Sequence, residues 1–564
     1  MELIRKTIGE CVNERAHLSG KQTALEMCGW SCTFEQMDRY SDFLAVRMGT
    51  RGIKKGTHVG IWSLNSPNWV ITFLALTKIG AVPVLINTCF VDDEVVRTLN
   101  YADVEVLYYG TGYKAVGYGD LLERVREQIP RVRQFIPIGG TEDETWGRKD
   151  DLIRTTCSPE ALRELEAQKR AVGPDDPACM IFTSGTTSFA KGVMLSHYSL
   201  VNNARAMVQA MHWGEGDRMC LAVPMFHCFG VTAGILACTL GGAEMDVLPC
   251  FKTVHVWDTL ERRRCTILNG VPSMFLALIR KPEFRGRRAD TLVSGIIAGS
   301  PVTPEEYAEI CGRFPGLHLQ PSYGQTETSP CVSIADWDEP KREKGASAGR
   351  VVDHVRVRIA DPGTGEIRER GRDGEIQVQG YNVMLGYYKL PEVTAGAFTE
   401  DGWLKTGDMG RLDGSGKLHV TGRIKEMIIR GGENISPEEI EQVIKKLDWV
   451  DQVKVVGIPA EVLQEEIAAC IVPKPGREVR KDELLDFLRP RLAHFKVPAC
   501  ILSFDSFPTN ASGKIVLKDL KRKAKAMAEA ERSAPKDGGP AACGPEARAG
   551  LQGRGCCCSS QKRN

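Results

Sequence analysis

Short apolar runs and segments with helical spacing alternate along the large N-terminal part of the chain. Residues 58–64, 81–86 and 292–298 are apolar runs that predict buried strands. Residues 66–79 and 272–279 carry a proline in their first turn and predict helices. Strands and helices that alternate through short loops form parallel sheets with right-handed crossovers, so we expect an α/β fold.

The sequence also marks where several helices begin. A hydroxyl residue followed three positions later by Glu or Gln can form a capping box, in which each side chain bonds the other residue's backbone. Three such pairs precede helical patterns: Thr33 with Gln36, Thr303 with Glu306, and Ser436 with Glu439. The longest apolar stretch, residues 69–86, contains Lys78, Gly80 and Pro83, so it predicts a helix and a strand in place of one membrane span.

Residues 181–192 combine the features of a phosphate-binding loop. The apolar run 178–182 predicts a buried strand, and helical spacing begins at Ser196. Glycines between them let backbone N–H groups approach an anion, hydroxyls donate hydrogen bonds, and a lysine adds charge. A Walker A loop is excluded, because Ala190 precedes the lysine and Gly192 follows it. From these residues alone, a plain connecting loop is the more common interpretation.

Later segments carry residues suited to nucleotide or acid chemistry. His227 lies in an apolar run, where a histidine is more often a packed core residue. Tyr323 beside a glycine can stack on a purine, and Glu327 is a hard oxygen ligand suited to Mg²⁺. Asp408 follows a tight turn, as ribose-binding carboxylates do, and Lys514 follows a Ser-Gly pair. Taken singly, each also fits an ordinary polar turn or surface charge.

Composition narrows the class of protein. The chain has 564 residues, of which 42% are hydrophobic and 26% charged, as in soluble globular proteins. Its net charge of +1 gives no electrostatic reason to expect a nucleic-acid partner. The 19 cysteines lack the paired spacing of zinc sites, which favours buried thiols in a reducing compartment. The charged N-terminus lacks the apolar core of a signal peptide, so we expect a cytoplasmic protein.

Residues 183–192 resemble the signature loop of the adenylate-forming enzymes, a superfamily of acyl-CoA synthetases, peptide-synthetase adenylation domains and beetle luciferases. The usual loop has glycine where this chain has Ser188 and often proline where it has Ala190. The resemblance spans about residues 34–520 and is closest to fatty-acyl-CoA synthetases of short- and medium-chain type. The other matching segments follow in the family's order: residues 224–230, 298–301, 320–328, 403–408, 422–426, 430–434 and 508–514.

The resemblance implies a role for each matching residue. Lys514 would bridge the substrate carboxylate and the α-phosphate, His227 would lie beside the carboxylate, and Glu327 would bind Mg²⁺. These three residues are the expected catalytic set. The residues expected to bind ATP are Thr183, Ser184, Gly185, Thr186, Thr187, Lys191, Gly299, Ser300, Pro301, Tyr323, Gly324, Thr326, Asp408 and Arg423.

The resemblance also implies two domains and a mobile joint. Residues 1–422 would form a large adenylation domain of βαβ-type subdomains, and residues 423–525 a small α+β lid that rotates about Lys425. Residues 526–564 lack apolar periodicity and are expected to be disordered. The acyl pocket would be lined by Phe229 and Gly230, and the CoA channel by Gly431 and Gly432.

The cysteine cluster near the end of the chain offers little evidence for a membrane anchor. Cys556, Cys557 and Cys558 lie beside basic residues and are suited to S-acylation, but they do not form a C-terminal prenylation motif. Stable anchoring usually takes two signals, so we do not expect a membrane partner. The sequence indicates neither the oligomeric state nor the length of the acid.

The implied reaction has two half-reactions. ATP with Mg²⁺ and a carboxylate give an acyl-adenylate and pyrophosphate; the thiol of CoA then attacks the acyl carbon and AMP leaves. An aryl-CoA ligase of 4-coumarate type, an amino-acid adenylation domain and a luciferase-like oxygenase share this scaffold and remain alternatives. A degenerate nucleotide-binding protein is the non-enzymatic alternative, and the joint retention of Lys191, Glu327, Asp408, Arg423 and Lys514 counts against it.

Overall fold

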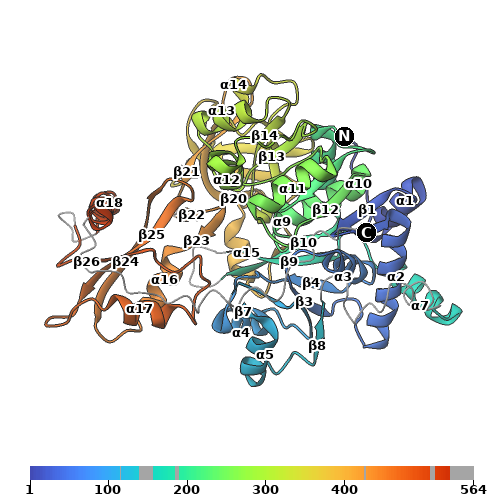
Figure 1. Cartoon of the computed structure of the whole chain (residues 1–564), viewed down its shortest axis with the longest axis horizontal. Coiled ribbons are helices and arrows are strands. Elements are labelled where there is room, and N and C mark those ends of the chain that lie inside the picture. Colours follow the sequence, from blue (N-terminus) through green and yellow to red (C-terminus); the bar gives the residue numbers. More distant parts are fainter. Residues whose placement is uncertain (115, 139–156, 184–189, 425–426, 509–514, 534–564) are drawn as a thin grey trace, which may run out of the picture.

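The computed structural model describes residues 1–114, 116–138, 157–183, 190–424, 427–508 and 515–533. A large N-terminal body and a smaller C-terminal lid lie side by side (Figure 1). The large body runs to the end of strand β21 at Arg423, and the lid begins with strand β22 at Ile428. The expected α/β fold with a small C-terminal domain is confirmed.

A seven-stranded sheet forms the centre of the large domain, in the order β19-β10-β9-β4-β3-β5-β8. Five of its strands, from β9 to β8, are parallel, as the alternating sequence pattern predicts. The strands are β3 (His58–Trp62), β4 (Val82–Leu85), β5 (Val106–Tyr109), β8 (Gln134–Pro137), β9 (Pro177–Thr183), β10 (Lys191–Ser196) and β19 (Gly386–Tyr387).

Helices pack on this sheet and carry most of the domain's core. Every residue of helix α3 (Pro67–Lys78) is buried, so the long apolar stretch is a core helix followed by strand β4. Among the described residues, no helix is both long and apolar enough to span a bilayer. The other helices here are α1 (Ile8–Ser19), α2 (Phe34–Thr50), α4 (Asp92–Tyr101), α5 (Tyr118–Val125), α7 (Pro159–Arg170) and α8 (His197–Met211).

A second set of strands continues the large domain. Two four-stranded sheets, β11-β12-β1-β2 and β13-β14-β15-β16, are linked by parallel bridges through Ile267. The strands are β1 (Thr23–Met27), β2 (Trp30–Thr33), β11 (Arg218–Leu221), β12 (Glu244–Val247), β13 (Ser294–Ile297), β14 (His318–Gly324), β15 (Cys331–Ile334) and β16 (Arg350–Val351). Their helices are α9 (Cys228–Gly230), α10 (Ala237–Gly241), α11 (Thr253–Arg263), α12 (Pro272–Arg280), α13 (Pro304–Arg313) and α14 (Lys341–Lys344).

An antiparallel sheet, β17-β18-β20-β21, completes the large domain and leads into the lid. Its strands are β17 (Val355–Ala360), β18 (Gly374–Gly380), β20 (Leu404–Leu412) and β21 (Leu418–Arg423), with α15 (Pro391–Ala397) before β20. The lid has a core of its own, which includes Ile435, Trp449 and Leu484. Its elements are β22 (Ile428–Arg430), β23 (Glu433–Ile435), α16 (Pro437–Ile444), β24 (Val450–Ala460), β25 (Gln464–Pro473), α17 (Lys481–Leu488), β26 (Cys500–Ser503) and α18 (Leu517–Ser533).

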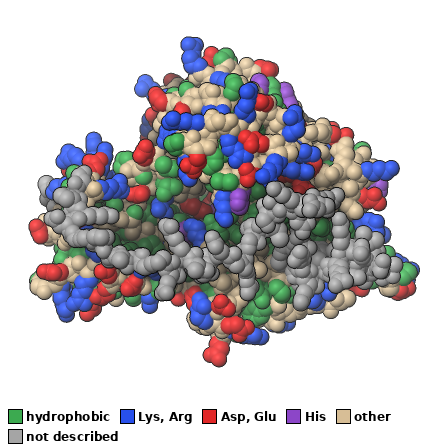
Figure 2. Space-filling view, viewed as in Figure 1, with side chains coloured by type: hydrophobic (Ala, Val, Ile, Leu, Met, Phe, Trp, Pro, Cys, Tyr) green, Lys and Arg blue, Asp and Glu red, His purple; other side chains and the backbone are tan. Residues whose placement is uncertain are grey.

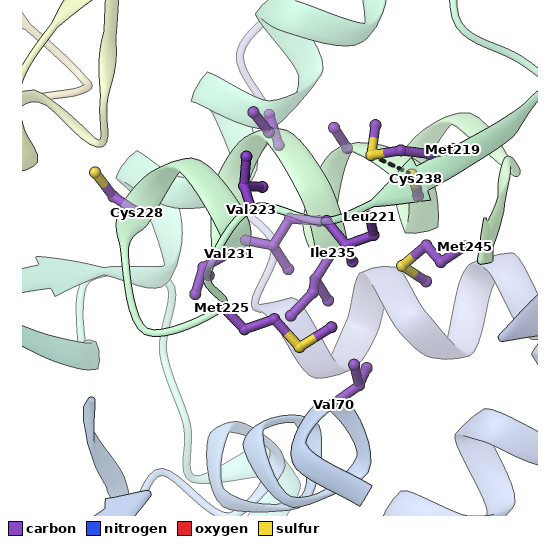
Figure 3. Packing of buried hydrophobic residues seen from close by; sticks show 14 of the residues in the cluster. Val70, Met219, Leu221, Val223, Met225, Cys228, Val231, Ile235, Cys238 and Met245 are labelled. Atoms are coloured by element: carbon purple, nitrogen blue, oxygen red, sulfur yellow. Dashed lines mark hydrogen bonds between the residues drawn. The ribbon is translucent and has the colours of Figure 1, made fainter. Parts of the chain in front are cut away.

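Tight apolar packing fixes the segment that carries His227. Met225 and Ile235 point toward Val70 of α3, and Val231 packs in the same layer (Figure 3). The π-helical segment Val231–Leu236 follows α9 directly and is buried along its whole length. Interiors packed in this way resist displacement, so the residues between β11 and α10 hold a fixed position.

Two local expectations differ from the structure. Thr33 and Thr303 form their capping boxes, but no box forms at Ser436. The Ser436 side chain makes no cap hydrogen bond, and the carboxylate of Glu439, the other half of the box, accepts a bond from Lys496. Residues 526–533, expected to be disordered, are helical in α18. The helix buries Ala524 and Ala528, whose small side chains give little apolar contrast in the sequence.

Surface charge is mixed. Lys and Arg side chains alternate with Asp and Glu side chains over the face shown in Figure 2. This interspersion fits the net charge of +1, since neither sign dominates that face.

Candidate active site

A cavity of about 1280 Å³ lies between the large domain and the lid. Pockets that hold one drug-sized ligand are typically about 300–1,000 Å³, so this cavity has room for more than one reactant. All the expected segments that the structure describes contribute to it. The predicted site residues that line it are Thr183, Lys191, His227, Phe229, Gly299, Tyr323, Gly324, Thr326, Glu327, Asp408, Arg423, Gly431 and Gly432.

The cavity lining includes a buried carboxylate between two donors. The Tyr323 hydroxyl donates to Asp408 Oδ2 at 2.8 Å, and Arg423 Nε contacts Asp408 Oδ1 at 2.7 Å. The register of β20 and β21 places Asp408 opposite Arg423, while Tyr323 comes from β14. Burial raises the pKa of Asp408, and the nearby Arg423 charge opposes that rise. Each carboxylate oxygen keeps a further lone pair, which suits it to accept bonds from a diol.

A second acidic group lines the same cavity. The Tyr387 hydroxyl donates to Glu327 Oε1 at 2.9 Å, and Lys191 Nζ lies 4.5 Å from the centre of the Tyr387 ring. Burial raises the pKa of Glu327, with the Tyr387 hydrogen bond and the Lys191 charge acting against it. Among the described residues, no three His, Cys, Asp or Glu side chains are grouped as a metal centre. A cation at Glu327 would therefore take most of its ligands from a phosphate chain and water, as Mg²⁺ usually does.

Strands lie on both sides of the predicted phosphate loop. We expected a strand, a loop and then a helix, but Lys191 begins β10, which pairs antiparallel with β9. Val193 and Leu195 are buried on this strand, and the helix begins only after its cap residue, Ser196. The register pairs Lys191 with Thr183, so no helix N-terminus follows Lys191 directly. Ser184, Gly185, Thr186 and Thr187 lie outside the described residues.

The lid reaches the cavity through the loop at residues 431–433. Glu433 Oε1 lies 3.3 Å from His227 Nε2, so one carboxylate of the lid contacts the histidine of the large domain. Burial acts to raise the pKa of Glu433, but the charge of His227 and the bond to it lower it overall. Gly431 and Gly432 have φ values of 61° and 88°, a region that glycine adopts without strain. A Cβ at Gly432 would lie 2.8 Å from Val271 Cγ1, so the loop fits closely against the large domain.

Part of the cavity lining is apolar. These residues come from α8, the segment after β11, α12 and β13, and Phe229 adds an aromatic ring. The neutral aliphatic side chains among them are Met207, Ala222, Val223, Met274, Ala277 and Ile296. A lining that combines apolar side chains with a cluster of polar groups suits a substrate with a polar head and a hydrocarbon tail.

Some expected residues lie away from the cavity. Gly230, Ser300 and Pro301 are not among the described residues that line it. A Cβ at Gly230 would meet the Pro224 carbonyl oxygen at 2.2 Å, so this glycine permits close backbone packing. The Pro301 carbonyl accepts a bond from Gln464 of the lid at 2.6 Å. Lys425, Lys514, Cys556, Cys557 and Cys558 lie outside the described residues.

Sequence reasoning missed several residues around the cavity. Tyr387 comes from a two-residue strand with no motif of its own, although it contacts Glu327. Lys496 lines the cavity from the lid. It was missed because the residues around it match none of the motifs used in the prediction. Its pairing with Glu439 is visible only in the structure.

Comparison with known proteins decides the family. The model of the AMP-binding enzymes matches residues 12–388, more than half of the chain, and the model of their C-terminal domain matches residues 439–514. The chain belongs to the AMP-binding enzymes. The putative acyl-CoA synthetase YngI of Bacillus subtilis is 36% identical over 93% of this chain and 98% of its own length. The human mitochondrial medium-chain acyl-CoA ligase ACSF2 is 31% identical over 90% of this chain and 86% of its own length.

Solved structures agree with the fold. The Mycobacterium tuberculosis fatty acyl CoA synthetase superposes with a TM-score of 0.65 at 28% identity, over 92% of this chain and 99% of that one. The o-succinylbenzoate CoA synthetase of Bacillus subtilis gives a TM-score of 0.76 at 24% identity, over 93% and 98% of the two chains. The expected activity class, ATP-dependent activation of an acid followed by thioester formation with CoA, is confirmed by these relatives.

Proposed function

We propose that this AMP-binding enzyme converts a medium-chain fatty acid to its CoA thioester. The observation that carries the proposal is the lining of the cavity, which combines the polar cluster around Asp408 and Glu327 with aliphatic side chains. The aliphatic side chains in the lining, among them Met207, Val223 and Ile296, suit an alkyl chain. The printed names of the ACSF2 relatives support the same chain-length class.

The polar end is the proposed ATP site. Asp408 would accept bonds from the ribose hydroxyls, with Arg423 and Tyr323 holding its carboxylate in place. Lys191 and Thr326 would contact the phosphates, because both line the cavity near Glu327. Glu327 would hold Mg²⁺, which neutralises phosphate charge when bound. Fixed positive and donor groups around the α-phosphate would stabilise the charge that builds up as the acid attacks it.

His227 is the proposed contact for the acid itself. It lines the cavity, and its Nε2 is engaged by Glu433 of the lid in this orientation. Lys514 would bridge the acid and the α-phosphate during adenylation. Lys514 and the loop at residues 431–433 both belong to the lid, and the two cannot occupy the same part of the cavity at once. We therefore propose that the lid turns between the two half-reactions. The orientation seen here, with Glu433 on His227, is the one assigned to thioester formation.

We propose that the protein resides in a reducing compartment, namely the cytoplasm. The 15 cysteines that the structure describes carry free thiols, and most are buried. For example, burial raises the pKa of the Cys228 thiol to about 12, so it stays protonated beside the site. Some relatives are named as mitochondrial, which makes that organelle the alternative to test.

A substrate panel tests the proposal. The purified chain would be incubated with MgATP and straight-chain acids from acetate to stearate, together with 4-coumarate and the standard amino acids. Pyrophosphate release would be measured with and without CoA, and products would be identified by mass. We expect a maximum of kcat/KM at medium-chain acids and acyl-CoA only when CoA is present. A maximum at 4-coumarate or at an amino acid would contradict the proposed substrate class.

A further inference from the structure

A buried lysine joins the two domains. Lys496 Nζ lies 2.7 Å from Glu94 Oε1 of the large domain and 2.9 Å from Glu439 Oε1 of the lid. The exposed fractions of Lys496, Glu94 and Glu439 are 4%, 4% and 8%. None of these residues belongs to the motifs from which the reaction was predicted. The sharing of one ammonium between carboxylates of two domains needs a separate explanation.

The charges of this triad depend on one another. Burial acts to lower the pKa of Lys496, but the two adjacent carboxylates raise it overall, so the side chain stays an ammonium ion. Burial raises the pKa of Glu94, and the charge of Lys496 opposes that rise. A buried charge that loses its partner is strongly unfavourable, so each group requires the others in place. The triad therefore stabilises the domain arrangement in which all three side chains meet.

The large domain holds its half of the contact in a fixed position. Glu94 Oε2 accepts a bond from Val91 N at 3.2 Å, which ties the carboxylate to the first turn of α4. The Phe90 ring lies on the same side, with its centre 5.4 Å from Lys496 Nζ. An ammonium near an aromatic face gains further stabilisation. The socket formed by Phe90 and Glu94 is thus part of the large domain and does not move with the lid.

The lid connects the triad to the loop that enters the active site. Glu439 lies in the first turn of α16, which begins two residues after the end of β23. That strand begins at Glu433, the residue that contacts His227. Lys496 also lines the active-site cavity. A short stretch of the lid therefore links the Glu94 contact to the Glu433 contact.

We propose that Lys496 is a positioning residue for the thioester-forming half-reaction, which selects the lid orientation by pairing with Glu94. When the lid turns for adenylation, Lys496 leaves Glu94 and keeps Glu439, which belongs to its own domain. When it returns, the restored triad places the loop at residues 431–433 on His227. This inference rests on the proposed function, since it assigns the triad to one of its two half-reactions.

The test separates the half-reactions in the full chain. Glu94→Gln removes the charge, keeps an oxygen for Val91 N, and leaves the lid's own Lys496–Glu439 pair intact. Adenylation would be measured as pyrophosphate release without CoA, and thioester formation as single-turnover consumption of supplied acyl-adenylate by CoA. Asp93→Asn is the matched control, because Asp93 is exposed in the same helical turn.

We expect Glu94→Gln to slow thioester formation about tenfold while adenylation stays within about twofold, a difference of about 1.4 kcal/mol in the favoured orientation. The control should leave both rates unchanged. An equal fall in both half-reactions would show a general structural role and overturn the proposal, as would rates matching the control. Wild-type chain that makes no acyl-CoA would instead refute the proposed function, so the two failures are distinguishable.

A double-mutant cycle with Lys496→Met addresses the same contact from the other side. If Lys496 acts on thioester formation through Glu94, adding Glu94→Gln to Lys496→Met should slow that step little further. Fully multiplicative losses would mean that the two residues act independently, which contradicts the proposal.

Discussion

Replacing Asp408 by Asn tests the ATP site at its most constrained group. Asp408 is 3% exposed and receives one bond from Tyr323 and one from Arg423. Asparagine offers a single carbonyl oxygen, so its NH₂ group must face one of these donors. At least one charge-assisted bond is lost, and Arg423 loses its buried counter-charge.

The structure sets the size of the effect. A hydrogen bond to a charged group contributes about 1.5–3 kcal/mol, which corresponds to roughly a 10- to 150-fold loss in kcat/KM for ATP. The assay is pyrophosphate release at fixed acid and varied ATP, without CoA. Asp413→Asn is the control. Asp413 lies in the turn after β20, pairs with His419 of β21, and does not line the cavity. If Asp408→Asn kept the wild-type dependence on ATP, or matched the control, the ribose assignment would be refuted.

Three further predictions concern the lid and the fold. Lys514→Ala should abolish adenylation and leave thioester formation from supplied acyl-adenylate largely intact; an equal loss of both would contradict the assigned roles. Gly432→Ala should slow thioester formation at least about tenfold. The new Cβ would lie 2.8 Å from Val271 Cγ1, and the φ of 88° strains any residue other than glycine. An unchanged rate would show that the loop does not need this fit. Burial lowers the pKa of His197 to about 4 from its ordinary 6.5. Between pH 6.5 and pH 4 the unfolded chain therefore binds more protons than the folded chain. The free energy of unfolding should fall by about 3 kcal/mol as the pH drops from 6.5 to 4. His197→Gln should remove this loss, which thermal melts at pH 7.5 and pH 5 would reveal; an identical pH dependence in the variant would contradict it.

Much of the large domain follows from local sequence signals. The capping boxes at Thr33 and Thr303 and the burial of α3 are set by a few neighbouring residues, so the pattern alone predicts them. Short motifs likewise sufficed to predict several site residues. Lys191, Tyr323 and Asp408, each taken from one motif, line a single cavity.

The features that the sequence did not reveal depend on distant partners. Residues 191–196 form a strand because β9 and β19 flank them, and β19 lies almost two hundred residues further along the chain. Glu439 leaves its expected cap because Lys496 brings a buried positive charge that competes for the carboxylate. Burial of Ala524 and Ala528 in α18 likewise depends on the lid core, which the alanine-rich segment does not indicate by itself.

The most direct test of the account is acid-dependent exchange of labelled pyrophosphate into ATP by the wild-type chain without CoA. If one cavity brings ATP and a fatty acid together, exchange should require the acid, and adding CoA should convert the bound adenylate to acyl-CoA and AMP. Exchange that proceeds without any acid, or an acid-dependent release of ADP in place of AMP, would contradict it.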